Sequence, residues 1–393
     1  MKLVIVSHTP HYRRGGKVVG WGPTIREIDQ LSEIFDQVVH IAPVHSKDAP
    51  QSALAYESER VRVRAVAPSG GGGVKNKLDV LRRAQSYVQA MRQELRDADA
   101  VHVRCPANIS LVALVVLMFT GHPRKRWLKY AGNWNPKGAE AWSYTLQRWL
   151  LRSGWHKGVV TVNGEWPNQP SFVRSFFNPC LNDQELLEGR EISGAKRMTD
   201  PIRLIFVGRL DSGKGADRTL QIVARHKELG GAALLDLVGD GKGRQSLEQL
   251  AKTLGIGDQV TFHGAQPRPT LAPLYSRAHL MILASGSEGW PKVLSEAMAY
   301  GVVPVASNVS SIPQYLERFN TGRSFAPGDL DGFADSIQWY ATHPGNWKQE
   351  SKNAVKEAEL FSYARHCKAV RRILEISDLD PVRPSARSEA FQS

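Results

Sequence analysis

Short apolar runs alternate with longer amphipathic stretches along the first 180 residues. The apolar run 3–6 precedes residues 24–35, where Ile25, Ile28 and Leu31 recur at helical spacing. Further strands are predicted at 38–42, 61–67, 100–103, 127–130 and 158–162, with helical segments such as 77–95 between them. Strands that alternate with helices in this way predict an α/β fold, with a parallel sheet covered by helices on both faces.

The pattern lapses into a polar, weakly periodic passage near residue 180 and then starts again. Strands are predicted at 202–207, 234–238, 259–263, 280–284 and 302–306, with helices at 216–228, 243–253 and 291–300. We therefore expect two α/β domains, 1–180 and 201–360, joined by a linker at 181–200. A helix at 361–377 and a disordered polar tail at 378–393 follow, and the glycines at 70–73 predict a flexible loop.

Composition narrows the class of protein. The chain has 393 residues, of which 42% are hydrophobic, and three cysteines without a CxxC pair, which excludes a disordered chain, a disulfide scaffold and a zinc framework. The most apolar stretch, 109–120, is shorter than the about 20 residues that cross a bilayer, so it predicts a core helix. The N-terminus lacks a signal-peptide core, and a cytoplasmic location is expected.

Positive charge is concentrated in the first half. Residues 1–180 carry 25 Lys and Arg against 13 Asp and Glu, whereas the remainder carries 26 against 25. Such asymmetry predicts a surface that meets something anionic, with a merely solvated basic face as the alternative. No nucleic-acid-binding motif accompanies the charge. We therefore expect an anionic membrane surface as partner, on the inner face of the membrane, and no nucleic acid.

Two glutamates mark the strongest candidate site. Glu288 follows the strand 280–284, and Glu296 lies within a helix that begins near Pro291 and ends at Gly301. Open α/β sheets bind ligands at the carboxyl ends of their strands, where Glu288 is expected. Ionised carboxylates accept strong hydrogen bonds from sugar hydroxyls, although an exposed glutamate on a helix is the alternative for either residue alone.

Glycine-rich turns with cations predict an anion site. The strand 202–207 leads through Arg209 and Lys214 to a helix, so two cations and a helix N-terminus are available to a diphosphate. The spacing is not that of a Walker loop. Gly239 follows another strand, in a weak imitation of a dinucleotide fingerprint. Near the N-terminus, Gly15 and Gly16 belong to a loop that we expect to admit a phosphate.

Four motifs in order carry a resemblance: GRL with KG at 208–215, VGDG at 238–241, FHGA at 262–265, and EG followed by E-AMA-G at 288–301. They resemble the C-terminal domain of the family-four retaining glycosyltransferases of the GT-B fold, also called glycosyl transferases group 1. The resemblance is good over 200–340 and looser over 1–180. It implies two Rossmann-like domains facing across a cleft, with the last helix crossing back to the first domain.

The resemblance also implies the chemistry. A nucleoside-diphosphate sugar, of UDP or GDP, is the expected co-substrate without a further cofactor or a metal, and the acceptor is a glycan or lipid-linked glycan on the first domain. Arg209 and Lys214 would bind the diphosphate, Glu288 the transferred sugar and Glu296 the ribose. The expected catalytic residues are Glu288, Lys214 and Arg209. The full expected donor site is Arg209, Lys214, Gly239, His263, Gly264, Glu288, Gly289, Trp290, Glu296, Gly15 and Gly16.

Two departures from the family pattern stand out. The chain reads EGWP where the family commonly has EGFG, so Pro291 lacks an N–H, and Trp290 or Lys292 is expected to compensate. Where the family often has a histidine in the first domain, this chain has LKYAGNWNP, which places Asn133, Trp134 and Asn135 on the acceptor side.

Other functions stay open at this point. A nucleotide-sugar epimerase or a phosphorylase of the same fold, an NAD-dependent oxidoreductase and a non-catalytic binding protein are the alternatives.

Overall fold

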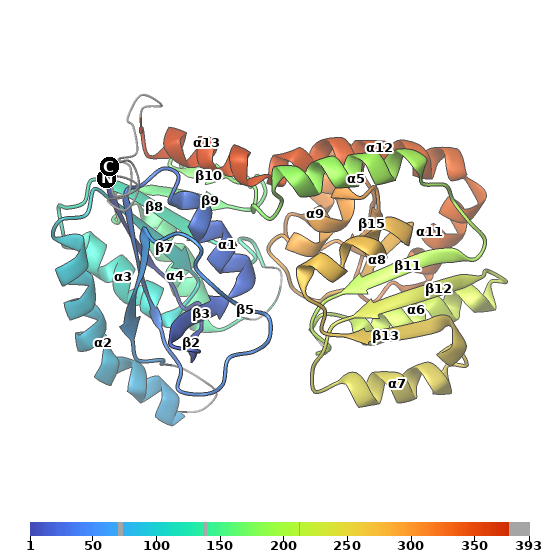
Figure 1. Cartoon of the computed structure of the whole chain (residues 1–393), viewed down its shortest axis with the longest axis horizontal. Coiled ribbons are helices and arrows are strands. Elements are labelled where there is room, and N and C mark those ends of the chain that lie inside the picture. Colours follow the sequence, from blue (N-terminus) through green and yellow to red (C-terminus); the bar gives the residue numbers. More distant parts are fainter. Residues whose placement is uncertain (70–73, 137, 139, 212, 377–393) are drawn as a thin grey trace, which may run out of the picture. The chain divides into compact units, whose positions relative to one another are not determined.

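The computed structural model describes residues 1–69, 74–136, 138, 140–211 and 213–376, and of helix α2 only the side chains from residue 82 onward. The predicted loop at 70–73 and tail at 378–393 lie outside these residues. The chain divides into two compact units: Met1–Phe176 with the segment from Tyr363 onward, and Phe177–Ser362 (Figure 1). Both units have the α/β architecture that the alternation of strands and helices predicted.

A seven-stranded parallel sheet forms the centre of the first unit, in the order β10-β9-β8-β7-β1-β4-β6. Its strands are β1 (Lys2–Val6), β4 (Gln37–Pro43), β6 (Val61–Val66), β7 (Ala100–Cys105), β8 (Lys125–Tyr130), β9 (Val159–Val162) and β10 (Val173–Ser175). The central strand β1 is buried along its whole length, as expected of a strand covered on both faces.

Helices cover both faces of this sheet. α2 (Val74–Leu95), α3 (Asn108–Met118) and α4 (Trp142–Ser153) pack on one face, while α1 (Gly22–Leu31) and α13 (Tyr363–Ile373) pack on the other. α3 is the predicted core helix. The last helix therefore belongs to the first unit, where Cys367 and Val370 join the core. Among the described residues, no helix is long and apolar enough to span a bilayer.

A small antiparallel sheet interrupts the path from β1 to α1. It consists of β2 (His11–Arg14), β3 (Lys17–Trp21) and β5 (Ala53–Ala55). Gly15 and Gly16 form the two-residue turn of the β2–β3 hairpin, with φ of 57° and 75°. Both central residues of such a turn need positive φ, which explains the glycines without a ligand. The two glycines thus lie in a hairpin that the sequence pattern did not predict, and their expected contact with a phosphate stays a prediction.

The second unit has a six-stranded parallel sheet in the order β13-β12-β11-β14-β15-β16. Its strands are β11 (Ile202–Val207), β12 (Ala233–Val238), β13 (Val260–Gly264), β14 (Leu280–Leu283), β15 (Val303–Ser307) and β16 (Arg323–Phe325). Its helices are α5 (Asp183–Ala195), α6 (Ala216–Glu228), α7 (Arg244–Thr253), α8 (Ala272–Arg277), α9 (Lys292–Ala299), α10 (Ile312–Phe319), α11 (Leu330–Thr342) and α12 (Pro344–Ala358).

The predicted linker at 181–200 is instead largely helical, since α5 lies within it and packs beside α12 (Figure 1). Asn182 and Glu185 form a capping box at its start. A Cβ on Gly189 would lie 2.2 Å from the carbonyl oxygen of Ala299, so a glycine is needed where α5 meets the end of α9. Glycine at a packed position weakens the apolar periodicity, which is why the sequence pattern indicated a linker.

Candidate functional site

The loop between β11 and α6 forms one side of the candidate site. Gly215 caps α6 with φ of 75°, and a Cβ there would lie 2.1 Å from the carbonyl oxygen of Ala284. The loop therefore lies directly against the end of β14, where the amide of Gly286 donates to the carbonyl of Gly213 at 3.0 Å. This packing brings the N-terminus of α6 to the carboxyl edge of the sheet, where free amides favour an anion.

Lys214 and Glu288 meet at this edge. The Lys214 Nζ donates to Glu288 Oε1 at 2.6 Å, and their side chains are 29% and 9% exposed. Arg209 lies in the same loop with a side chain 77% exposed, and its Nη2 is 2.9 Å from Asp211 Oδ2. The structure thus brings two of the predicted catalytic residues, Lys214 and Glu288, into direct contact and leaves the third, Arg209, largely exposed to solvent.

Gly239 and Gly264 hold neighbouring loops together. The Gly239 amide donates to the carbonyl of Gly264 at 2.9 Å, and a Cβ on Gly239 would lie 1.8 Å from the carbonyl oxygen of Gly208. Any side chain at Gly239 would therefore displace the loop that carries Arg209. The glycines of the VGDG and FHGA motifs keep the ends of β11, β12 and β13 close to one another.

His263 is tied to a buried carboxylate. Its Nε2 lies 2.7 Å from Asp236 Oδ1, and Arg277 also donates to the same carboxylate from its Nε at 2.9 Å. The ring is thus fixed within the second unit, which leaves the backbone around Gly264 for the predicted contact with a base.

Glu296 is held by an arginine that the sequence did not single out. Arg268 Nη1 donates to Glu296 Oε1 at 2.8 Å, and Arg268 also binds Glu185 with Nη2 at 3.0 Å from Oε2. The hydroxyl of Tyr275 donates to Glu296 Oε2 at 3.4 Å. Burial, followed by the Glu296 charge, raises the pKa of Tyr275 well above its ordinary value. Glu296 therefore has a fixed orientation, although each oxygen retains capacity for a further hydrogen bond.

Trp290 does not offer its ring to a ligand. The indole is 3% exposed, stacks on Phe361 with ring centroids 5.1 Å apart, and donates from Nε1 to Ser295 Oγ at 2.8 Å. The expectation that this side chain compensates for Pro291 is corrected, because a large aromatic ring is buried in the core of the second unit. Pro291 itself is the N-cap of α9.

Arg218 is a second cation that the sequence analysis missed. It lies one turn after Lys214, and its Nε donates to the carbonyl of Ala284 at 2.7 Å. Its Nη2 is buried without a hydrogen-bond partner. The guanidinium therefore holds the end of β14 by a hydrogen bond, and the loop that carries Glu288 begins there. Its spacing from Lys214 was the signal that could have indicated it.

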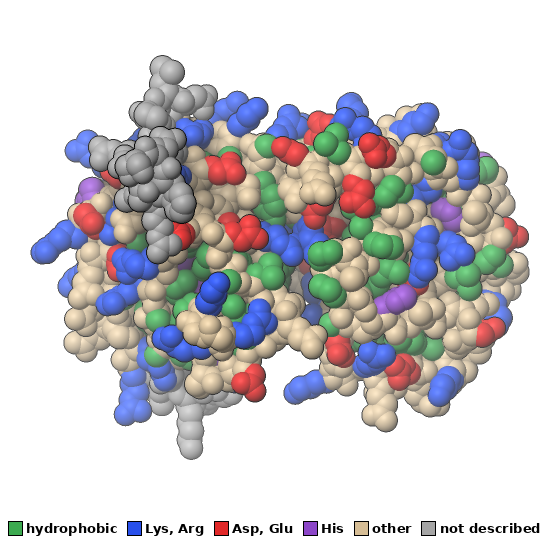
Figure 2. Space-filling model, viewed as in Figure 1, with side chains coloured by type: hydrophobic (Ala, Val, Ile, Leu, Met, Phe, Trp, Pro, Cys, Tyr) green, Lys and Arg blue, Asp and Glu red, His purple; other side chains and the backbone are tan. Residues whose placement is uncertain are grey.

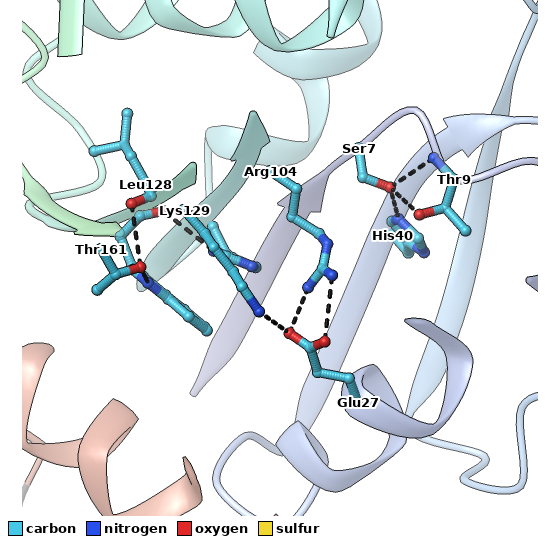
Figure 3. Close-up of polar contacts among 10 residues, drawn as sticks. Ser7, Thr9, Glu27, His40, Arg104, Leu128, Lys129 and Thr161 are labelled. Atoms are coloured by element: carbon cyan, nitrogen blue, oxygen red, sulfur yellow. Dashed lines mark hydrogen bonds and ion pairs between the residues drawn. The ribbon is translucent and has the colours of Figure 1, made fainter. Parts of the chain in front are cut away.

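The carboxyl edge of the first sheet carries a buried ion cluster (Figure 3). Arg104 of β7 binds Glu27 of α1 through Nη1 at 2.7 Å and Nη2 at 3.3 Å, and Lys129 of β8 donates to the same carboxylate at 2.7 Å. Glu27 is fully buried. Close by, Ser7 Oγ lies 2.6 Å from His40 Nε2. Burial comes first among the causes that lower the pKa of His40 well below its ordinary value, so that ring is neutral at pH 7.

Of the residues expected on the acceptor side, Trp134 lies in the core, whereas Asn133 and Asn135 lie in a loop. Trp134 is 1% exposed, packs edge-to-face on Tyr130, and lies under the guanidinium of Arg152 at 4.8 Å. Its side chain is part of the core, which corrects its expected contact with an acceptor. Asn133 accepts from the amide of Asn135 at 3.1 Å within the same loop, and the acceptor role of these two residues stays a prediction.

Comparison with known proteins supports the family resemblance. Residues 190–359 match the family model described as "Glycosyl transferases group 1". The matched part of the chain is therefore similar to group 1 glycosyltransferases. It contains Arg209, Lys214, Glu288 and Glu296, so the motifs that suggested the resemblance lie within the matched residues. The resemblance drawn from those motifs is confirmed.

Curated relatives agree with this similarity. A D-inositol 3-phosphate glycosyltransferase of Kribbella flavida is 31% identical over 218 residues, which are 52% of this chain and 50% of the relative. An N-acetyl-alpha-D-glucosaminyl L-malate synthase of Bacillus anthracis is 41% identical over 103 residues, 26% of each chain. The matches thus span half or less of the length of these relatives.

Solved structures extend the likeness beyond the matched residues. A sucrose-phosphate synthase from Thermosynechococcus elongatus has a TM-score of 0.68 at 18% identity, covering 96% of this chain and 100% of its own. The HepE protein of Anabaena, solved with UDP-glucose, has a TM-score of 0.67 at 16% identity and covers 95% and 99%. The predicted GT-B fold of two Rossmann-like domains is confirmed.

Proposed function

We propose that this protein is a retaining glycosyltransferase that moves a sugar from a nucleoside-diphosphate sugar to a glycan acceptor. The contact between Lys214 and Glu288, beside the N-terminus of α6, carries the proposal. Cations and free amides suit a diphosphate, and a carboxylate suits sugar hydroxyls. A nucleotide sugar carries its diphosphate directly beside its sugar, so a protein that binds it needs both kinds of group within a few ångströms of each other.

The proposed reaction depends on electrostatic stabilisation of the leaving group. Arg209 and Lys214 would neutralise the charge that develops on the departing nucleoside diphosphate, in place of a divalent metal. The diphosphate would compete with Glu288 for Lys214, which frees the Glu288 carboxylate to accept hydrogen bonds from the sugar. Glu296, oriented by Arg268, would bind the ribose. Front-face attack by the acceptor fits this arrangement, because it requires strong stabilisation of the leaving group and no protein nucleophile.

The relatives support a uridine donor over a guanosine donor, since the HepE structure holds UDP-glucose. The first unit would bind the acceptor. We further propose a lipid-linked glycan as acceptor and a role in polysaccharide or glycolipid synthesis on the cytoplasmic side of a membrane. The net charge of +12 over residues 1–180 supports an anionic surface as partner.

Titration calorimetry and thermal shift with UDP, GDP, ADP, their sugars and NAD test the donor site. A ligand that binds the folded state raises the unfolding temperature by mass action. We expect a uridine or guanosine diphosphate to bind, and Lys214→Ala to abolish that binding. Lys252→Ala, at an exposed lysine of α7, is the control and should bind normally.

Two results would contradict this proposal. Binding of NAD alone would favour an oxidoreductase. Conversion of the sugar nucleotide to an epimer without any acceptor would favour an epimerase of the same fold.

A further inference from the structure

Exposed aromatic side chains gather on one stretch of the first unit. Within the described residues, the large hydrophobic side chains that remain exposed are Trp21, Val115, Phe119, Trp142, Tyr144, Trp149, Trp155, Leu187 and Leu229. Most of them lie between residues 115 and 155. We call the set Val115, Phe119, Trp142, Tyr144, Trp149 and Trp155 the α3–α4 patch. Large apolar side chains that stay exposed on neighbouring elements are typical of an interaction site.

The fold places these side chains on neighbouring helices. α3 and α4 contact each other and cover the same face of the first sheet. Trp142 and Trp149 lie seven residues apart on one side of α4, while Leu150 and Leu151 of the same helix face the core. The rings of Trp149 and Trp155 meet edge-to-face at 5.2 Å. Phe119, at the end of α3, is 82% exposed.

Positive charge surrounds the α3–α4 patch. Between residues 111 and 159 the chain has eight Lys and Arg and a single acidic residue, Glu140, which is paired with Arg148. Of these cations, Arg126, Lys129 and Arg148 are buried and add no surface charge. Arg124 and Lys157 are exposed in the segments that follow α3 and α4. α2 packs beside α3 and exposes Arg82 and Arg92. Lys and Arg side chains are also spread over the visible face of the first unit (Figure 2).

Aromatic rings flanked by cations suit a particular partner. Trp and Tyr have an apolar body with a polar N–H or O–H, and they concentrate at the headgroup level of bilayers. Surface helices that present Trp and Phe together with Lys and Arg bind membranes that contain anionic lipids. A protein partner would need acidic side chains of its own to match these cations. An anionic bilayer supplies both an apolar layer for the aromatic rings and negatively charged headgroups for the cations.

We propose that the α3–α4 patch is the surface by which this protein lies on an anionic membrane. The rings of Trp149, Trp155 and Phe119 enter the headgroup region, and Arg124 and Lys157 contact lipid phosphates. This inference deepens the proposed function, since it names where the first unit meets the membrane that holds a lipid-linked acceptor.

Vesicle sedimentation tests the α3–α4 patch without any turnover. The full chain should sediment with phosphatidylcholine vesicles that contain phosphatidylglycerol, and much less with phosphatidylcholine alone. Trp149→Ser with Trp155→Ser should weaken binding to the anionic vesicles by about tenfold or more, because two interfacial rings are lost. Trp21→Ser is the matched control: Trp21 is 52% exposed, as is Trp149, but lies outside the patch, and its loss should leave binding unchanged.

A second pair of variants separates charge from apolar contact. Arg124→Gln with Lys157→Gln should remove much of the salt-sensitive part of the binding, whereas Lys252→Gln in the second unit should not. Equal sedimentation of the tryptophan variant and the unaltered protein would overturn the proposal. So would a concentration-dependent dimer in analytical ultracentrifugation that the tryptophan substitutions abolish, since the patch would then join two copies.

Nucleotide calorimetry on the same variants keeps the two proposals apart. A tryptophan variant that loses vesicle binding but still binds a uridine or guanosine diphosphate supports the membrane surface independently of the donor site. Vesicle binding without any nucleotide binding would support the membrane-binding role of the α3–α4 patch and contradict only the proposed function.

Discussion

The carboxyl edges of the two parallel sheets differ in how far their charged side chains are buried. In the first unit, Glu27 is fully buried and binds both Arg104 and Lys129, whose side chains are 13% and 5% exposed. In the second unit, Lys214 and Arg209 are 29% and 77% exposed. The same edge of the same kind of sheet is thus closed by an internal ion cluster in one unit and left accessible in the other.

This difference separates structural charge from charge that is available to a ligand. Burying an ion costs several kcal/mol unless a counter-charge and hydrogen bonds compensate, and the two cations around Glu27 supply both. An exposed cation has no such cost and can exchange its partner for a substrate. The two glutamates, Glu27 and Glu288, should therefore respond differently to substitution, although each accepts from a lysine.

Removal of the Glu27 carboxylate should have the largest effect on stability. Glu27→Ala removes the buried carboxylate that Arg104 and Lys129 share, which should cost about 3–5 kcal/mol. Hydrogen exchange read by mass spectrometry should show faster exchange in β7 and β8 while the strands of the second unit stay protected. Glu33→Ala, at an exposed glutamate just after α1, is the control, and similar exchange in the two variants would refute a structural role for the cluster.

Removal of the Lys214 ammonium should reduce turnover and leave the fold intact. Loss of one electrostatic donor to the leaving group typically lowers kcat by about 10²–10³-fold. Lys214→Ala should lower stability less than Glu27→Ala does, because Lys214 is 29% exposed, whereas Arg104 and Lys129 around Glu27 are 13% and 5% exposed. Glu288→Ala should behave in the same way, and Lys252→Ala should retain full turnover. A normal rate in both site variants would remove Lys214 and Glu288 from the proposed mechanism.

The same contrast explains which features the sequence could predict. Most strands of the two parallel sheets were predicted because apolar runs such as 202–207 are local signals, whereas the three-residue strands β10 and β16 were missed because they are too short to give such a signal. Lys214 was singled out because it lies in a glycine turn between a strand and a helix. Glu27 and Lys129 are 102 residues apart, and no local pattern indicates that they meet. Arg268 was missed for the same reason, since its partner Glu185 lies in a helix whose glycines hid its periodicity.

Histidines should make the edge of the first unit sensitive to acid, an effect on stability that is smallest near pH 7 and grows as the pH falls. Burial is the main reason that the pKa of His11 falls to about 4, and burial also lowers the pKa of His40. The unfolded chain, with a histidine pKa of about 6.5, binds protons that the folded state excludes. Through His11, stability should therefore fall by up to about 1.4 kcal/mol per pH unit as the pH drops from about 6.5 to about 4, and His40 adds to this fall in the same direction. Urea unfolding at several pH values gives the free energy of unfolding as a function of pH. This free energy should change less with pH in His11→Gln than in the unaltered protein, whereas His343→Gln, at an exposed ring of the second unit, should keep the original dependence.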